Sequence, residues 1–310
     1  FDRAWLNHQA GNSAKAFQLF TNYIERFPTN HLAPLAQKWI ADFHFQSGKF
    51  AEAEQVYRRL FENTNLLELA GDLSWEARLS AGRSAFFRQN YAEAETLLTA
   101  VVNATNAPLG ELARAEFYLG DVAAEQTART PTNLVQAINH YERVALEMTN
   151  SPLNAAAWGR LGDCRLQLGE YAQATAAYQT VTELPGADVT TRSQAKLGLA
   201  RVLAGQAYTE GETDVSERFL QQALDHCLEI VFGGNLRSAN EKMDPFWVKE
   251  AGLMAGRLAK RLGQAEQERK LYTRLAEELP TMPLWQVRLD ALNGKTNTPV
   301  APTPPQPPTP

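Results

Sequence analysis

Residues 158–185 read WGRLGDCRLQLGEYAQATAAYQTVTELP, and this stretch decides the fold. Its apolar and small residues recur at helical spacing on both sides of Gly169, which predicts two helices joined by a tight turn. Gly169 permits the left-handed backbone that ends the first helix, and Pro185 prevents the second helix from continuing. The small residues Gly162 and Ala174 let the two helices cross closely. The stretch therefore predicts a helical hairpin.

The same hairpin recurs along the chain. Its second helix carries a small alanine at each copy, and successive alanines are 37 to 43 residues apart. Two weaker copies follow, one with Cys227 in place of the aromatic residue and one with Tyr272 before Pro280. In the first of these we expect an enlarged loop between the helices, around residues 208–214. Self-similarity at such a period is the signature of a repeat protein. The five regular alanines are Ala16, Ala53, Ala94, Ala137 and Ala174.

This hairpin resembles the tetratricopeptide repeat (TPR). The residues at the family's spacing are Trp158, Leu161, Gly162, Gly169, Tyr171, Ala174, Tyr178 and Pro185, and Arg165 stands where the family usually has an aromatic. The resemblance implies an all-α, right-handed TPR-like superhelical solenoid, in which each hairpin contacts only its neighbours. Residues 20–60, with Phe27 followed by Pro28, are similar to bacterial envelope TPR proteins of the BamD and YbgF kind. That similarity favours a bacterial periplasm or envelope.

We expect residues 1–292 to form one repeat domain of about seven hairpins with a C-terminal capping helix. Phe1 already lies inside a helical pattern, so we expect a fragment or processed form with further repeats upstream. Residues 293–310 change abruptly to a proline-rich composition and should form an extended, disordered tail, either a linker or a ligand. The hairpins cover roughly residues 1–28, 31–64, 66–103, 108–148, 152–185, 188–232 and 244–280, and the cap covers 283–292.

Composition narrows the classes of function. The net charge is -5 and the pI about 5.7, so no global positive field attracts nucleic acid. No run of about 18 apolar residues is present that could span a membrane. Cys164 and Cys227 fall at interior positions of helical patterns, where free cysteine behaves as a small buried apolar residue; a disulfide is the alternative.

The sequence contains no recognisable catalytic or metal-binding pattern. Its five histidines are scattered without a second His or Cys at ligand spacing. The segment 294–296 reads Gly-Lys-Thr but lacks the leading glycine of a phosphate-binding loop. We therefore predict a protein that is not an enzyme and has no cofactor, metal or small-molecule substrate. The alternative is an enzyme whose catalytic groups come together from distant helices.

In proteins of the TPR family, the first helix of each hairpin lines a concave groove that receives a partner. By that resemblance, the residue after the small position should point into the groove, which would be acidic in its middle and basic toward the C-terminal end. Aromatic and arginine side chains are typical of binding hot spots. The predicted groove residues are Asp42, Phe45, Arg83, Phe86, Phe87, Asp121, Glu125, Asp163, Gln167, Arg201, Arg257 and Arg261.

These residues lead to a specific hypothesis. The groove arginines are expected to bind carboxylate-bearing segments, while Phe45 and Phe86 take an apolar anchor. The alternative is that the phenylalanines belong to the core between repeats and that the charges only keep the surface soluble. We therefore expect a non-catalytic protein–protein interaction scaffold with a protein or peptide partner. A helical-repeat nucleic-acid binder, or an accessory module of a larger protein, is the alternative function.

Overall fold

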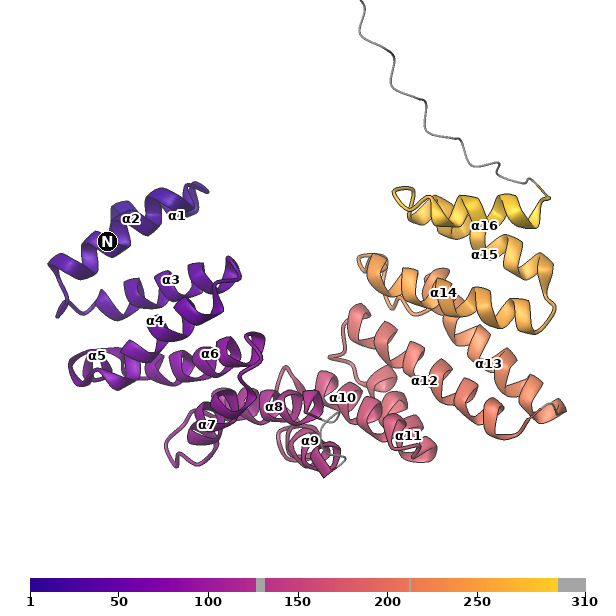
Figure 1. Cartoon of the computed structure of the whole chain (residues 1–310), viewed down its shortest axis with the longest axis horizontal. Helices are drawn as coiled ribbons and strands as arrows, with labels where there is room; N and C mark the ends of the chain where they lie inside the picture. Colours follow the sequence, from indigo (N-terminus) through magenta and orange to yellow (C-terminus); the bar gives the residue numbers. More distant parts are fainter. Residues whose placement is uncertain (127–131, 212, 295–310) are drawn as a thin grey trace, which may run out of the picture. The chain divides into compact units, whose positions relative to one another are not determined.

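The computed structural model describes residues 1–126, 132–211 and 213–294. Within these ranges every regular element is a helix (Figure 1), which confirms the predicted all-α repeat fold. The chain forms two compact units, Phe1–Cys164 and Arg165–Pro310. Nearly all of the predicted proline-rich tail, from residue 295 onward, lies outside the described residues.

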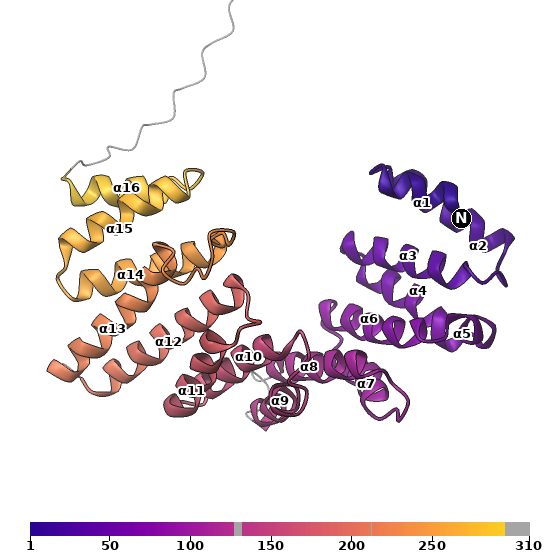
Figure 2. The same ribbon diagram turned by 180° about the vertical axis from the view of Figure 1, so that it is seen from behind.

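The first unit is built from helix hairpins that pack in chain order, as Figures 1 and 2 show from opposite sides. Two elements were not expected from the sequence: the short helix α5 (Thr64–Ala70) and the π-helical segment η1 (Arg143–Glu147). Helix α10 (Asn154–Gln167) runs across the unit boundary. The hairpins are α1 (Asp2–Gln9) with α2 (Ser13–Arg26), α3 (Ala33–Gln46) with α4 (Phe50–Glu62), α6 (Leu73–Phe87) with α7 (Tyr91–Val102), and α8 (Leu109–Glu125) with α9 (Thr132–Glu142).

The second unit is also built from helices that pack in chain order, beginning with α11 (Tyr171–Glu183). The sequence predicted an enlarged loop around 208–214, but α12 continues through Thr209. The extra length of this repeat lies instead in its two long helices and in the segment 232–244 that follows them. The remaining helices are α12 (Val189–Thr209), α13 (Asp214–Val231), α14 (Pro245–Arg261), α15 (Ala265–Glu278) and α16 (Leu284–Leu292).

The turn inside each hairpin needs a left-handed residue. Gly48, Gly169 and Gly263 adopt φ angles of 72°, 74° and 69° at equivalent turns, which confirms the role predicted for Gly169. In the third hairpin this position is Gln89, with φ of 63°. An L-residue with a side chain is strained in that conformation, so this turn is less favourable than its equivalents.

Small residues let aromatic rings enter the helix crossings. A methyl group added at Gly120 would come within 2.5 Å of a ring carbon of Tyr141, which is almost fully buried. In the second unit Gly198 makes the same room for the ring of Tyr178, and Ala174 is fully buried beside it on α11. The small-residue pattern of the sequence therefore reports close helix packing.

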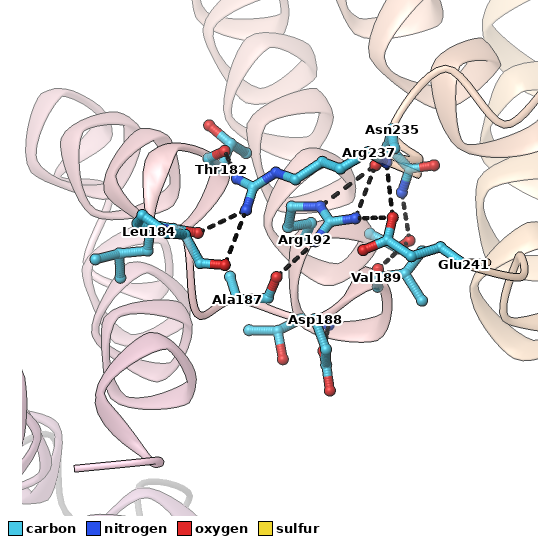
Figure 3. A network of polar contacts seen from close by, with 12 residues as sticks. Thr182, Leu184, Ala187, Asp188, Val189, Arg192, Asn235, Arg237 and Glu241 are labelled. Carbon is cyan, nitrogen blue, oxygen red and sulfur yellow. Dashed lines mark hydrogen bonds and ion pairs between the residues drawn. The ribbon is translucent and has the colours of Figure 1, made fainter. Parts of the chain in front are cut away.

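A buried arginine holds the long segment after α13 against the rest of the second unit (Figure 3). Arg192 of α12 donates to the carbonyl oxygens of Ala187 and Asn235, at 2.5 and 3.1 Å, and forms a 2.6 Å ion pair with Glu241. Arg237 extends from the same segment to carbonyl oxygens at the end of α11, including that of Thr182 at 2.6 Å. The bonds of Arg237 satisfy carbonyls that the end of α11 leaves without partners, and those of Arg192 satisfy buried carbonyls of the connecting segments.

Candidate functional site

Two of the predicted groove aspartates are held by tyrosines of their own hairpins. Tyr57 donates to Asp42 at 2.5 Å, and Tyr141 donates to Asp121 at 2.7 Å. Burial raises the pKa of Asp121, while its ion pair with Arg160 at 3.3 Å and the tyrosine bond act in the opposite direction. Both carboxylates therefore join the two helices of a hairpin, whatever else they contact.

Arg83 lies between aromatic rings of neighbouring first helices. Its guanidinium carbon is 5.1 Å from the ring centre of Phe45 on α3 and 5.0 Å from that of Tyr118 on α8. Among the described residues Arg83 has no ion pair, and its Nε is buried without a hydrogen bond. The charge of Arg83 is thus stabilised by π-electron density on both sides, and the side chain links three consecutive first helices.

The predicted phenylalanines belong to an aromatic cluster at the ends of α3 and α6. Phe45 and Phe86 are partly buried against the hydrophobic cores of the first unit. Phe87 stays 48% exposed, although its ring stacks on Phe50 at 5.1 Å and meets Phe45 edge to face at 5.5 Å. The packing of Phe45 and Phe86 matches the alternative reading as core between repeats, and only Phe87 offers much free surface.

The other acidic and polar members of the predicted set vary in exposure. Glu125 and Gln167 are exposed, and Asp163 is half-buried.

An aromatic cleft that the sequence analysis missed lies between the first helices α1 and α3. It has a volume of about 440 Å³. Phe1 and Trp5 stack on one side, with ring centres 6.4 Å apart, and Trp39 and Phe43 stack on the other, 5.6 Å apart. The sequence could have indicated this cleft, because the two aromatic residues of each pair are four positions apart and therefore lie on one helix face. Asp42 is the one member of the predicted set that lines this cleft.

A basic face lies on the first helices of the second unit. We define it as Arg201 of α12, Arg257, Lys260 and Arg261 of α14, and Arg288 of α16. None of the five forms an ion pair within the described ranges, and the first four are exposed. Arg201, Arg257 and Arg261 belong to the predicted groove set, whereas Lys260 and Arg288, which lies on the capping helix α16, do not.

Three cations of the basic face share one pocket. Arg257, Lys260 and Arg288 line a pocket of about 500 Å³ together with Glu268 and Tyr272 of α15. Arg288 donates to the Tyr272 hydroxyl at 3.3 Å and lies 5.6 Å from the centre of its ring. The pocket is therefore bordered by two successive first helices.

Arg201 and Arg257 act on a common neighbour, the thiol of Cys227. Burial raises the pKa of that thiol to about 12, while the charges of both arginines act in the opposite direction. Cys164 and Cys227 are both buried, as the sequence predicted, and neither forms a disulfide within the described residues.

The described residues give no sign of a metal site or a membrane span. No group of three or more His, Cys, Asp or Glu side chains among them could hold a metal ion. No helix in the described part of the chain is both long and apolar enough to cross a bilayer.

A family model described as tetratricopeptide repeat matches residues 1–65, 44–111 and 133–188, which together make up more than half of the chain. The chain belongs to the tetratricopeptide repeat family. TPR repeats are generally scaffolds for protein–protein interaction, and the TPR fold is typically non-catalytic. A comparison with curated proteins found no match.

Several solved structures resemble this TPR chain, each at 15% sequence identity. The C-terminal part of a TPR repeat-containing protein from Cytophaga hutchinsonii has a TM-score of 0.58, with 93% of this chain and 98% of that one covered. PilF of Pseudomonas aeruginosa gives 0.50, covering 85% and 97%. BtubC (BKLC) from P. vanneervenii gives 0.51, covering 84% and 94%. At this identity the likeness shows the fold alone.

Proposed function

We propose that this TPR chain is a non-catalytic scaffold that binds a segment of a partner protein along the first-helix faces of its hairpins. The observation that carries the proposal is the aromatic cleft between α1 and α3. Trp5 on one wall is 43% exposed and Leu35 on the other is 46% exposed. Large apolar side chains that converge on one concavity are typical of a protein-binding surface.

The surrounding contacts support a preformed site. The centre of the Trp39 ring lies 4.7 Å from that of the buried Phe20 ring and 5.4 Å from that of the His8 ring, so packing on two sides sets its position. Lys38 and Asp42 pair with each other at 2.8 Å at the edge of the cleft. An apolar anchor with a polar rim is the usual anatomy of a protein interface. A partner would therefore meet a surface that needs little reorganisation.

Site-specific photocrosslinking tests this proposal. A benzophenone amino acid replaces Leu35 in the cleft or, as a matched control, Leu69 of α5, which is 38% exposed and does not line the cleft. In extract of the organism that encodes the chain, we expect a discrete protein adduct at Leu35 and none at Leu69. Adding Trp5→Ala should abolish the adduct. Identical adducts at both positions, or an adduct unaffected by Trp5→Ala, would contradict binding in the cleft.

A further inference from the structure

Charges in the second unit are sorted by helix, although the whole chain carries -5. The first helices α12, α14 and α16 contain eight basic residues and only two acidic ones, Glu250 and Asp290. The second helices α13 and α15 show the reverse, with eight acidic and four basic residues. The first helices of this unit thus carry a local positive charge that the net charge of the chain conceals.

The positive charge is concentrated in the basic face because the other cations of these helices are neutralised. Arg192 pairs with Glu241, and Lys196 and Lys249 pair with Glu229 and Glu250. The five members of the basic face have no such partner within the described part of the chain. In the first unit three first-helix cations have a carboxylate partner, Lys38 with Asp42, Arg114 with Glu111 and Arg160 with Asp121, whereas Arg78 and Arg83 lie against aromatic rings.

The geometry brings these unpaired cations together. Arg257, Lys260 and Arg288 border one pocket. One carboxylate, that of Glu268, also lines the pocket, and its side chain is only 8% exposed. Three cations and one carboxylate leave the pocket with an excess of positive charge, which an incoming carboxylate would offset.

We propose that the basic face is a docking surface for an acidic segment of a partner protein, whose carboxylates pair with Arg257, Lys260 and their neighbours. This inference rests on the scaffold function proposed above and names the chemistry of one partner. Arginine can hold a carboxylate through two parallel hydrogen bonds, which adds geometric selectivity to the charge. A short acidic peptide fits the local positive charge, whereas the acidic second helices and the net negative charge oppose a long polyanion such as nucleic acid.

The experiment measures fluorescence anisotropy of the full chain with a short fluorescein-labelled peptide of alternating Glu and Ala. Its twin with Gln in place of Glu controls for charge. We expect the Glu peptide to bind and the Gln twin to bind at least about tenfold more weakly, with affinity falling as salt is raised. The double variant Arg257→Glu/Lys260→Glu should weaken binding of the Glu peptide by about tenfold or more.

The matched control is Arg26→Glu/Lys270→Glu, which makes the same change in net charge at exposed residues of α2 and α15. It should keep near-wild-type affinity. Because a charge reversal can also disturb folding, Arg257→Gln/Lys260→Gln gives a milder variant, and thermal unfolding of each variant checks its fold. Equal loss in the test and control variants would overturn the proposal, since only net charge would then matter.

Two further results would overturn it: equal binding of the Glu and Gln peptides, or tighter binding of an oligodeoxythymidine with the same number of charges. The outcome is separable from that of the scaffold proposal. The Leu35 crosslink reports on the first unit, whereas Arg257 and Lys260 lie in the second. A Leu35 adduct that persists while the acidic peptide fails to bind would refute the basic face alone.

Discussion

The hydroxyl of Tyr141 donates a 2.7 Å hydrogen bond to the carboxylate of Asp121, across the two helices of one hairpin. The same relationship joins Tyr57 to Asp42 at 2.5 Å in the second hairpin. In both cases the aspartate directly follows the small residue of the first helix. A position that family resemblance assigned to partner binding therefore also holds its own hairpin together.

Replacing Tyr141 with Phe should destabilise the first unit by about 1.5 to 3 kcal/mol, because the bond goes to a charged group and the carboxylate loses a donor. The pKa of Asp121 should also rise further, since the tyrosine bond is one of the contacts that lower it. Urea unfolding measures the first effect and NMR titration the second. Tyr118→Phe is the control, because that hydroxyl makes no hydrogen bond within the described residues. Equal losses in the two variants would contradict the assigned role.

Acid should destabilise the chain partly through Glu116. Burial alone would raise the pKa of Glu116, but hydrogen bonds from His140 at 2.6 Å and Arg143 at 2.8 Å outweigh it and lower the pKa below its ordinary 4.5. Since the folded pKa is below the unfolded one, the ionised group stabilises the fold above about pH 4.5, and this contribution is lost as pH falls through the folded pKa.

The variant Glu116→Gln should therefore be less stable than wild type near neutral pH and should lose less further stability below about pH 4.5. The measurement is the urea midpoint across a pH series. Glu125→Gln, an exposed change on the same helix, should keep the wild-type pH dependence. If the urea midpoints of wild type and Glu116→Gln fell in parallel as pH is lowered, Glu116 would not be responsible for this loss of stability in acid.

Gln89→Gly should stabilise the third hairpin. Gln89 has φ of 63°, where the equivalent turns use glycine, and left-handed backbone costs an L-residue about 1 to 2 kcal/mol. Part of this gain is offset because glycine makes the unfolded chain more flexible, so we expect a net gain below about 1 kcal/mol. The reciprocal change Gly169→Ala should destabilise its hairpin. Calorimetric melting measures both, and a lower melting temperature for Gln89→Gly would contradict the strain.

Arg192→Gln should destabilise the second unit by about 3 kcal/mol, because it removes charge-assisted bonds to buried carbonyl oxygens. It should also release the segment 232–244, seen as faster amide hydrogen exchange there. Arg218→Gln, at an exposed position of α13, serves as the control and should change stability little. Unchanged exchange in the 232–244 segment would show that Arg192 does not hold it.

The sequence by itself determined the repeat. Gly169, Ala174 and Tyr178 act through local backbone freedom and side-chain size, and these properties are written in residue identity and spacing. The net charge of each helix likewise follows from its residue identities. The sequence also indicated helical faces, because helical periodicity predicts which residues share one.

Only the tertiary structure decided what each side chain does on its face. Arg83 and Arg257 hold equivalent positions in their repeats, yet the rings of Phe45 and Tyr118 enclose the charge of Arg83, whereas Arg257 lies exposed beside Lys260. Which cation is paired depends on residues from other helices, and sequence spacing does not specify those distances. The aromatic cleft arose in the same way, because its two stacked pairs come from separate helices that meet only when the hairpins pack.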